Sequence, residues 1–145
     1  ELLSKANFVR VPNTLGALQQ LTSFHRNQFE YPVVGITGSN GKTIVKEWIY
    51  HLLQDTYQIV RSPKSYNSQI GVPLSVWSME EKYNFGIFEA GISETGEMQR
   101  LQNIIRPDIG IFTNIGQAHQ ENFKSIKQKI EEKLQLFEES ETSIY

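Results

Sequence analysis

The stretch VVGITGSNGKTIVKEW, residues 33–48, decides how this chain folds. It begins with β-branched and apolar residues typical of a buried strand, passes through the turn Gly38–Gly41, and continues with apolar residues at helical spacing. Glycine loses much conformational freedom when it is ordered, so a turn this rich in glycine indicates a functional role that offsets this cost. Between a strand and a helix, such a turn lets backbone N–H groups converge on a phosphate at the positive end of the helix. We therefore interpret residues 38–43 as a phosphate-binding loop.

Two polar residues at the end of the loop support this interpretation. Lys42 supplies an ammonium group for phosphate oxygens, and Thr43 supplies a hydroxyl group for Mg²⁺. The strict form of the motif has glycine at position 36, where this chain has Ile36. The plain alternative is an ordinary turn between a strand and a helix. The Gly-Lys-Thr triplet at a strand-to-helix junction favours nucleotide binding.

Composition limits the class of protein. The 145 residues are 39% hydrophobic and 21% charged, which is typical of one globular domain. With 14 Lys and Arg against 16 Asp and Glu, the formal charge is -2, so a nucleic-acid partner is not expected. The sequence contains no cysteine, no apolar run of roughly 20 residues and no signal-peptide pattern. We expect a cytoplasmic protein without disulfides and without a membrane partner.

Strand-like and helix-like segments alternate along most of the chain. The expected strands are 31–37, 57–62, 83–92 and 107–115, and the expected helices after them are 42–54, 70–79, 96–106 and 125–139. Strands separated by helices indicate an α/β fold, with a parallel sheet flanked by helices. In that architecture ligands bind at the carboxyl ends of the strands, which is where the phosphate-binding loop (P-loop) lies.

Residues 1–30 do not follow this alternation. They predict a connecting strand and one amphipathic helix, with Leu15, Leu18, Leu21 and Phe24 facing the sheet. We expect this segment to be a linker or the end of a preceding domain.

Three further polar residues fall where a phosphate site needs them. Glu89 closes the apolar run FGIF, so its carboxylate should emerge at the carboxyl edge of the sheet and could hold Mg²⁺ there. The alternative is a loop or helix-capping glutamate. His119 follows the last expected strand and reaches the same edge, although a lone loop histidine is more often solvated. Asn67 either belongs to the same site or forms a turn.

One lysine on the last expected helix stands out. The apolar stripe of that helix consists of Ile126, Ile130, Leu134 and Phe137. Lys133 projects within this stripe, whereas Lys129 is expected at its side or behind it. Lys133 can lay its aliphatic stem on the core and extend its ammonium group to water, or it can reach a functional site.

Several blocks together resemble a known family. GITGSNGKT, NSQIGVPLS, EAGIS with the following GEM, TNIGQAHQENF and EKLQLF occur in the order of the central ATP-binding domain of the Mur ligases. These enzymes form amide bonds in peptidoglycan precursor synthesis, and the resemblance covers residues 32–139. The Asn-x-x-Ile-Gly-Val-Pro block looks most like the type that adds D-alanyl-D-alanine to UDP-N-acetylmuramoyl-tripeptide. The resemblance implies that residues 31–145 are part of a truncated central domain, whose N-terminal and C-terminal partner domains in the same enzyme lie outside this chain.

The resemblance also implies roles for individual residues. ATP would be bound by Gly38, Ser39, Asn40, Gly41, Lys42, Thr43 and Asn67. Thr43 and Glu89 would hold one Mg²⁺, and His119 would hold a second together with Lys133, which matches the carbamylated lysine of the family. Lys42, His119 and Lys133 would be the catalytic residues. In the implied reaction a substrate carboxylate takes the γ-phosphoryl group to become an acyl phosphate, and the incoming amine displaces phosphate.

Three alternatives remain at this point. The chain could come from another Mur ligase, or from a ligase similar to folylpolyglutamate synthase, which typically has Gly-Lys-Gly-Ser where this chain has Gly-Lys-Thr-Ile. It could also be a non-catalytic nucleotide-binding module. A switch protein of that kind would need an Asn-Lys-x-Asp motif, which the sequence lacks. The isolated chain is expected to be inactive as a ligase.

Overall fold

The computed structural model describes residues 7–116 and 120–145. Its elements in chain order are α1 (Thr14–Arg26), β1 (Val33–Thr37), α2 (Lys42–Leu53), β2 (Ile59–Arg61), α3 (Gly71–Val76), β3 (Phe85–Glu89), α4 (Glu97–Ile105), β4 (Ile109–Phe112), η2 (Gln120–Asn122), α5 (Ile126–Leu134), η3 (Gln135–Phe137) and β5 (Thr142–Ile144). The η labels denote short 3-10 helices. The four expected strands and the helices after them are confirmed, within narrower bounds.

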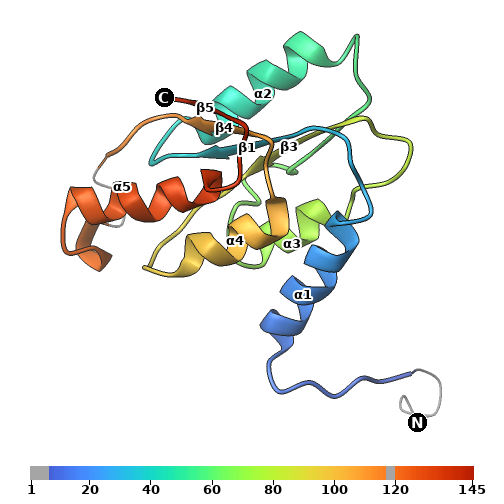
Figure 1. Ribbon diagram of the computed structural model, residues 1–145, viewed down its shortest axis with the longest axis horizontal. Coiled ribbons are helices and arrows are strands. Elements are labelled where there is room, and N and C mark those ends of the chain that lie inside the picture. Colours follow the sequence, from blue (N-terminus) through green and yellow to red (C-terminus); the bar gives the residue numbers. More distant parts are fainter. Residues whose placement is uncertain (1–6, 117–119) are drawn as a thin grey trace.

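The strands form one parallel sheet in the order β2-β3-β1-β4-β5. β1 is central, because Val34 pairs with Ile87 of β3 on one side and with Ile109 of β4 on the other. Figure 1 shows α2 on one face of the sheet and α3, α4 and α5 on the opposite face. The α/β class is therefore confirmed. The edge strand β5 was not expected, because three residues in a polar segment carry too little periodicity to indicate a strand.

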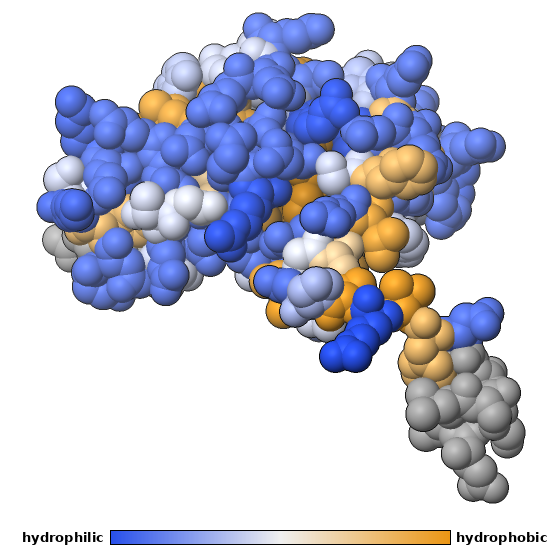
Figure 2. Space-filling view, turned by 60° about the horizontal axis from the view of Figure 1, so that its bottom comes forward, coloured by the Kyte–Doolittle hydropathy of each residue, from blue (hydrophilic) through white to orange (hydrophobic). Residues whose placement is uncertain are grey.

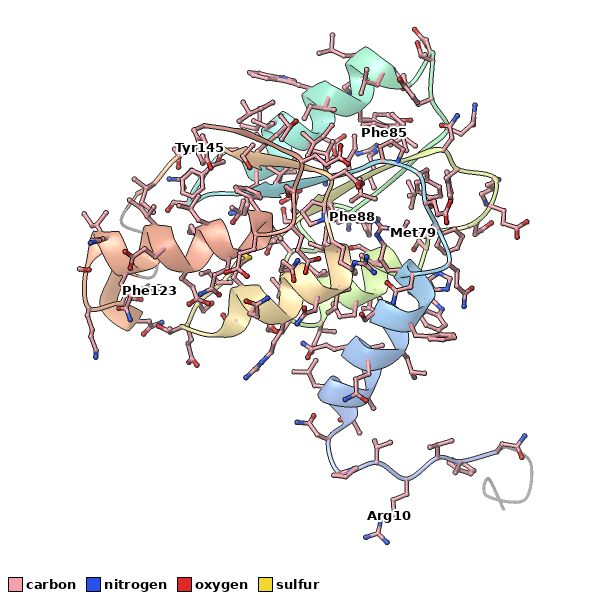
Figure 3. The ribbon with its side chains drawn as sticks, in the orientation of Figure 1. Arg10, Met79, Phe85, Phe88, Phe123 and Tyr145 are labelled. Atoms are coloured by element: carbon pink, nitrogen blue, oxygen red, sulfur yellow. The ribbon has the colours of Figure 1, made fainter. Side chains whose placement is uncertain are left out.

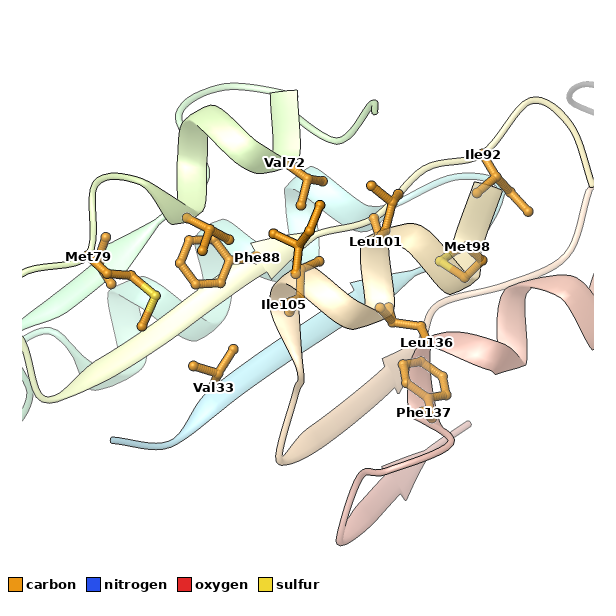
Figure 4. Packing of buried hydrophobic residues seen from close by; sticks show 14 of the residues in the cluster. Val33, Val72, Met79, Phe88, Ile92, Met98, Leu101, Ile105, Leu136 and Phe137 are labelled. Atoms are coloured by element: carbon orange, nitrogen blue, oxygen red, sulfur yellow. The ribbon is translucent and has the colours of Figure 1, made fainter. Parts of the chain in front are cut away.

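Successive residues of the central strands face opposite sides of the sheet and build two hydrophobic cores. The core beneath α2 contains Val34 and Ile87. The larger core contains Phe88, packed with Val72 of α3 and Ile105 of α4 (Figure 4). Phe85 and Phe88, three residues apart on β3, lie in different cores (Figure 3). Because both faces of the sheet are covered, its carboxyl edge is left to carry the polar residues.

The helix α1 corrects two expectations. Residues 7–13 form no strand. The helix packs against α3 and α4, below the sheet in Figure 1, so Leu21 and Phe24 are exposed rather than facing the sheet. Its C-terminal turn is held instead by a polar contact, since the guanidinium group of Arg26 donates to the carbonyl oxygen of Ile105 at 2.9 Å. This bond ties the end of α1 to the end of α4.

Figure 2 shows a mostly hydrophilic face, with hydrophobic residues gathered near the base of α1 and the stretch before α1 reaching away from the body. Within residues 7–116 and 120–145, no helix combines the length and the hydrophobicity that a bilayer crossing requires.

Candidate functional site

The loop Gly38–Gly41 joins the end of β1 to the start of α2, in the middle of the carboxyl edge of the sheet. Gly38 has a φ of 143° and Gly41 a φ of 81°, which are conformations that L side chains rarely adopt. A Cβ atom on Gly38 would also overlap the hydroxyl group of Thr113, after β4. The shape of the loop therefore requires both glycines.

Residues that follow β4 hold the loop in place. The N–H group of Ser39 donates to the carbonyl oxygen of Asn114 at 2.9 Å, and that of Asn40 donates to Asn114 Oδ1 at 3.0 Å. The Thr113 hydroxyl donates to the carbonyl oxygen of Asn40 at 2.6 Å. Sequence reasoning missed Thr113 and Asn114. Their position directly after a central strand was an available signal, because the ends of parallel strands meet at one edge.

The N-terminus of α2 faces the same edge. Its cap residue is Gly41, and within the described residues no side chain caps it. The first N–H groups of a helix have no partner inside the helix and carry a partial positive charge. A cavity of about 210 Å³ opens beside this terminus and is lined by Gly38, Lys42, Asn67 and Lys133, among others. The cavity thus joins the loop, the segment after β2 and α5.

Two lysines in this cavity share one acceptor. Lys42 Nζ donates to the carbonyl oxygen of Gly38 at 2.8 Å, and Lys133 Nζ donates to the same oxygen at 3.2 Å. Burial lowers the pKa of Lys42, and the charge of Glu89 partly opposes this effect. Burial, together with the positive charges of Lys42 and Lys129, lowers the pKa of Lys133 to about 8. The ammonium group of Lys133 therefore reaches the loop and does not extend to water.

Glu89, at the end of β3, is fully buried. Its Oε2 accepts from the Thr43 hydroxyl at 3.1 Å and from Asn67 Nδ2 at 3.4 Å. The Thr43 hydroxyl also lies 3.2 Å from Ser65 Oγ. The other carboxylate oxygen, Oε1, lies 2.9 Å from the ammonium nitrogen of Lys46, a residue that sequence reasoning missed. Thr43, Asn67 and Glu89, which the sequence places in three separate segments, thus form one cluster.

The helix α5 buries part of the expected face, since Lys133 and Phe137 are buried as predicted, but its buried side is turned away from Ile126. Lys129, Glu132 and Lys133 are buried, whereas Ile126 is exposed. Lys129, expected beside or behind the apolar stripe, donates from Nζ to the carbonyl oxygen of Gly116 at 2.6 Å. Polar side chains can take buried positions when they find hydrogen-bond partners there. This face of α5 brings Lys129 and Lys133 toward the loop.

The cluster around Glu89 has the donor chemistry of a magnesium site. In the described part of the chain, no three His, Asp or Glu residues gather as a metal-binding group. Glu89 instead has hydroxyl groups as neighbours, those of Thr43 and Ser65. Mg²⁺ prefers oxygen ligands and usually keeps waters and phosphate oxygens in its shell. One carboxylate and a hydroxyl group therefore fit Mg²⁺ bound together with a phosphate. His119, expected at a second metal, lies outside the described residues.

The fold and this site define an α/β domain built around a glycine-rich loop between a strand and a helix, with a lysine, a threonine and a buried carboxylate beside it. A comparison with known families narrows the class, because residues 36–145 match the Mur ligase middle domain. The chain belongs to the Mur ligase family.

Individual relatives agree with this assignment. The chain is 39% identical over 120 residues to the UDP-N-acetylmuramoyl-tripeptide–D-alanyl-D-alanine ligase of Borreliella burgdorferi, covering 83% of this chain and 26% of that protein. The crystal structure of MurF from Acinetobacter baumannii matches with a TM-score of 0.86 and 26% identity, over 91% of this chain and 29% of that one. MurF ligase from Thermotoga maritima, in complex with ADP, matches with a TM-score of 0.82 and 29% identity, over 94% of this chain and 33% of that one. The chain spans about a quarter to a third of the length of these proteins.

Proposed function

We propose that this chain is the ATP-binding part of a ligase that adds D-alanyl-D-alanine to UDP-N-acetylmuramoyl-tripeptide in peptidoglycan precursor synthesis. The observation that carries the proposal is that Lys42 and Lys133 both contact Gly38 of the loop, while Thr43, in the next turn, contacts the buried carboxylate of Glu89. The name of the Borreliella relative favours this branch over other Mur ligases and over a ligase of the folate type. The names of the Borreliella and Bacillus relatives, both ligases, favour an enzyme over a binding module without catalysis.

The loop and the first turn of α2 would hold the triphosphate of ATP. Backbone N–H groups at the start of α2 offer unpaired donors, and Gly38, Ser39, Asn40 and Gly41 shape the cradle around them. Lys42 would exchange the carbonyl oxygen of Gly38 for a phosphate oxygen, and a charged acceptor makes the stronger hydrogen bond. Asn67 lines the same cavity.

Thr43 and Glu89 would hold Mg²⁺, whose charge lowers the repulsion between a triphosphate and an incoming carboxylate. We propose His119 for a second Mg²⁺, next to a carbamate on Lys133. The lowered pKa of Lys133, about 8, leaves more neutral amine at neutral pH than an ordinary lysine has, and the neutral amine is the form that adds CO₂. The carbamate would carry a negative charge between Lys42 and Lys129, where the free amine meets two like charges.

In the proposed reaction, Lys42 neutralises charge on the γ-phosphoryl group as it passes to the terminal carboxylate of the tripeptide. The products of this step are ADP and an acyl phosphate. The amine of D-alanyl-D-alanine then forms a bond to the acyl carbon, the C–O bond to phosphate breaks with its electrons leaving on phosphate, and the nitrogen releases one proton to water. Domains on either side, in the same cytoplasmic enzyme, would bind the UDP group and deliver the amine.

Replacement of Lys42 by alanine in the full-length enzyme tests this proposal. We expect phosphate release that depends on both substrates to fall at least about 100-fold, because the ammonium group is placed to stabilise charge that develops on the phosphoryl group. The affinity for ADP, measured by calorimetry, should fall as well. Lys127→Ala removes an exposed lysine of α5 and should leave both measurements unchanged. Wild-type turnover in Lys42→Ala would contradict the assignment of the loop.

A further inference from the structure

The proposed roles leave one buried ionic group without a function. Lys46, one turn after Lys42 on α2, has no exposed surface. A buried ammonium group is costly unless charges and hydrogen bonds compensate it. Lys46 Nζ lies 2.9 Å from Glu89 Oε1, and it donates to the carbonyl oxygens of Ser62, at 2.8 Å, and of Lys64. Two N–H donors of the ammonium group are thus hydrogen-bonded to backbone, and the charges of Glu89 and of Glu47, whose Oε1 lies 3.3 Å from the same nitrogen, compensate its charge.

These contacts belong to a closed cycle of three residues that includes Glu89. Ser62, whose carbonyl oxygen accepts from Lys46, also accepts at its Oγ from the backbone N–H group of Glu89, at 3.1 Å. Lys46, Ser62 and Glu89 therefore bind one another in a cycle that spans α2, the segment after β2 and the end of β3. The same segment after β2 carries Ser65 and Asn67, which contact Thr43 and Glu89. One ammonium group thus connects α2 and the end of β3, which carry Thr43 and Glu89, the proposed ligands of the first Mg²⁺.

The two oxygens of Glu89 have different surroundings. Oε2 has the Thr43 hydroxyl and the Asn67 amide as donors. Oε1 is buried, has no hydrogen bond of good geometry within the described residues, and pairs with Lys46 through charge. Without Lys46, the uncompensated oxygen would draw the carboxylate toward other donors, and the orientation of Oε2 would change.

We propose that Lys46 is a positioning residue, which fixes the Glu89 carboxylate so that Oε2 faces Thr43 and thereby sets the metal affinity of the site. This inference rests on the proposed function, because it assigns Glu89 and Thr43 to a metal that accompanies the nucleotide. Partners that orient a ligand from behind commonly change metal affinity by about 10- to 100-fold when they are removed. Lys46 would act in this way through Glu89 and not through contact with the nucleotide.

The test compares Lys46→Met, Glu89→Gln and the double variant with the wild type, all as full-length enzyme. Mn²⁺ serves as the probe, and electron paramagnetic resonance measures its binding in the presence of ADP. We expect Lys46→Met to weaken Mn²⁺ binding by about 10- to 100-fold. The double variant should bind Mn²⁺ no more weakly than Glu89→Gln alone, because Lys46 has no further effect once its partner is neutral. The affinity for ADP without metal should stay within about twofold of the wild type.

Lys127→Met is the matched control, since it makes the same change at an exposed position of α5 and should alter none of these values. A folded Lys46→Met with wild-type Mn²⁺ affinity, or losses that multiply in the double variant, would overturn the inference. If Lys46→Met does not fold, the comparison of the double variant with Glu89→Gln decides. If neither variant with methionine folds, Lys46 serves structure alone and the inference is wrong. Failure of the wild type to bind ADP would instead contradict the proposed function.

Discussion

Gly38 is the residue on which the shape of the loop depends most directly. Its positive φ and the nearby Thr113 hydroxyl both oppose a side chain. We expect Gly38→Ala to reduce the free energy of unfolding by about 2–4 kcal/mol, and to reduce ADP binding because the loop must shift. Gly96→Ala is the matched control, since Gly96 also has a positive φ but has open space around its Cβ position. If Gly38→Ala and Gly96→Ala lose equal free energy of unfolding in urea denaturation, the overlap with Thr113 has no effect on stability.

Lys133 gives a prediction for the dependence of stability on pH. In the folded protein its pKa is lowered to about 8, mainly by burial, whereas the unfolded chain keeps the proton up to a pH near 10.5. Between these values the unfolded state binds more protons, so stability rises with pH. In CO₂-free buffer we expect Lys133→Met to be more stable than the wild type at pH 7, by on the order of 1–3 kcal/mol. The difference should narrow from pH 8 to pH 10.5 in urea denaturation, and a constant difference would contradict the placement of this amine.

At the scale of elements, α5 shows where sequence periodicity is insufficient. Counting apolar residues placed Ile126 on the buried face with Lys133, yet Ile126 is exposed and the helix buries Lys129 and Glu132 beside Lys133. The carboxylate of Glu132 accepts from the N–H groups of Gly96 and Met98, at 2.7 and 3.2 Å. Such partners lie far away in the sequence, so no local pattern indicates them.

The same contact makes Glu132 the cap of α4. Gly96 occupies the cap position of α4 and has no side chain to offer, so the carboxylate from α5 satisfies the free N–H groups. We expect Glu132→Ala to reduce the free energy of unfolding by about 1–3 kcal/mol, and Glu132→Gln by less, since an amide oxygen still accepts. Glu131→Ala, at the exposed neighbouring position, should change stability by no more than about 0.5 kcal/mol in the same thermal or urea measurement. Equal effects at positions 131 and 132 would contradict the capping role.

For the whole molecule, the sequence predicts the parallel α/β fold and the loop at the carboxyl edge. The rule that strand ends share one edge also predicts the place of Glu89 at this edge. The sequence does not predict the strand order, because the neighbours of β1 come from distant segments. The sequence also does not indicate that Lys46 is buried, because a lysine next to apolar residues on a helix is ordinarily taken to extend to solvent. Its burial depends on an ion pair with a residue 43 positions later in the chain.

The central place of β1 determines when its loop can form during synthesis. Both neighbours of β1 lie later in the chain, since Val33 pairs with Gly86 and Val34 with Ile109. The bonds that shape the loop end on Asn114. At typical translation rates, the roughly 75 residues between the loop and Asn114 take about 4–15 s to make. During that interval the nascent chain carries its most glycine-rich segment without the contacts that order it, so the nucleotide that we propose for this loop could assist folding only after β4 has left the ribosome.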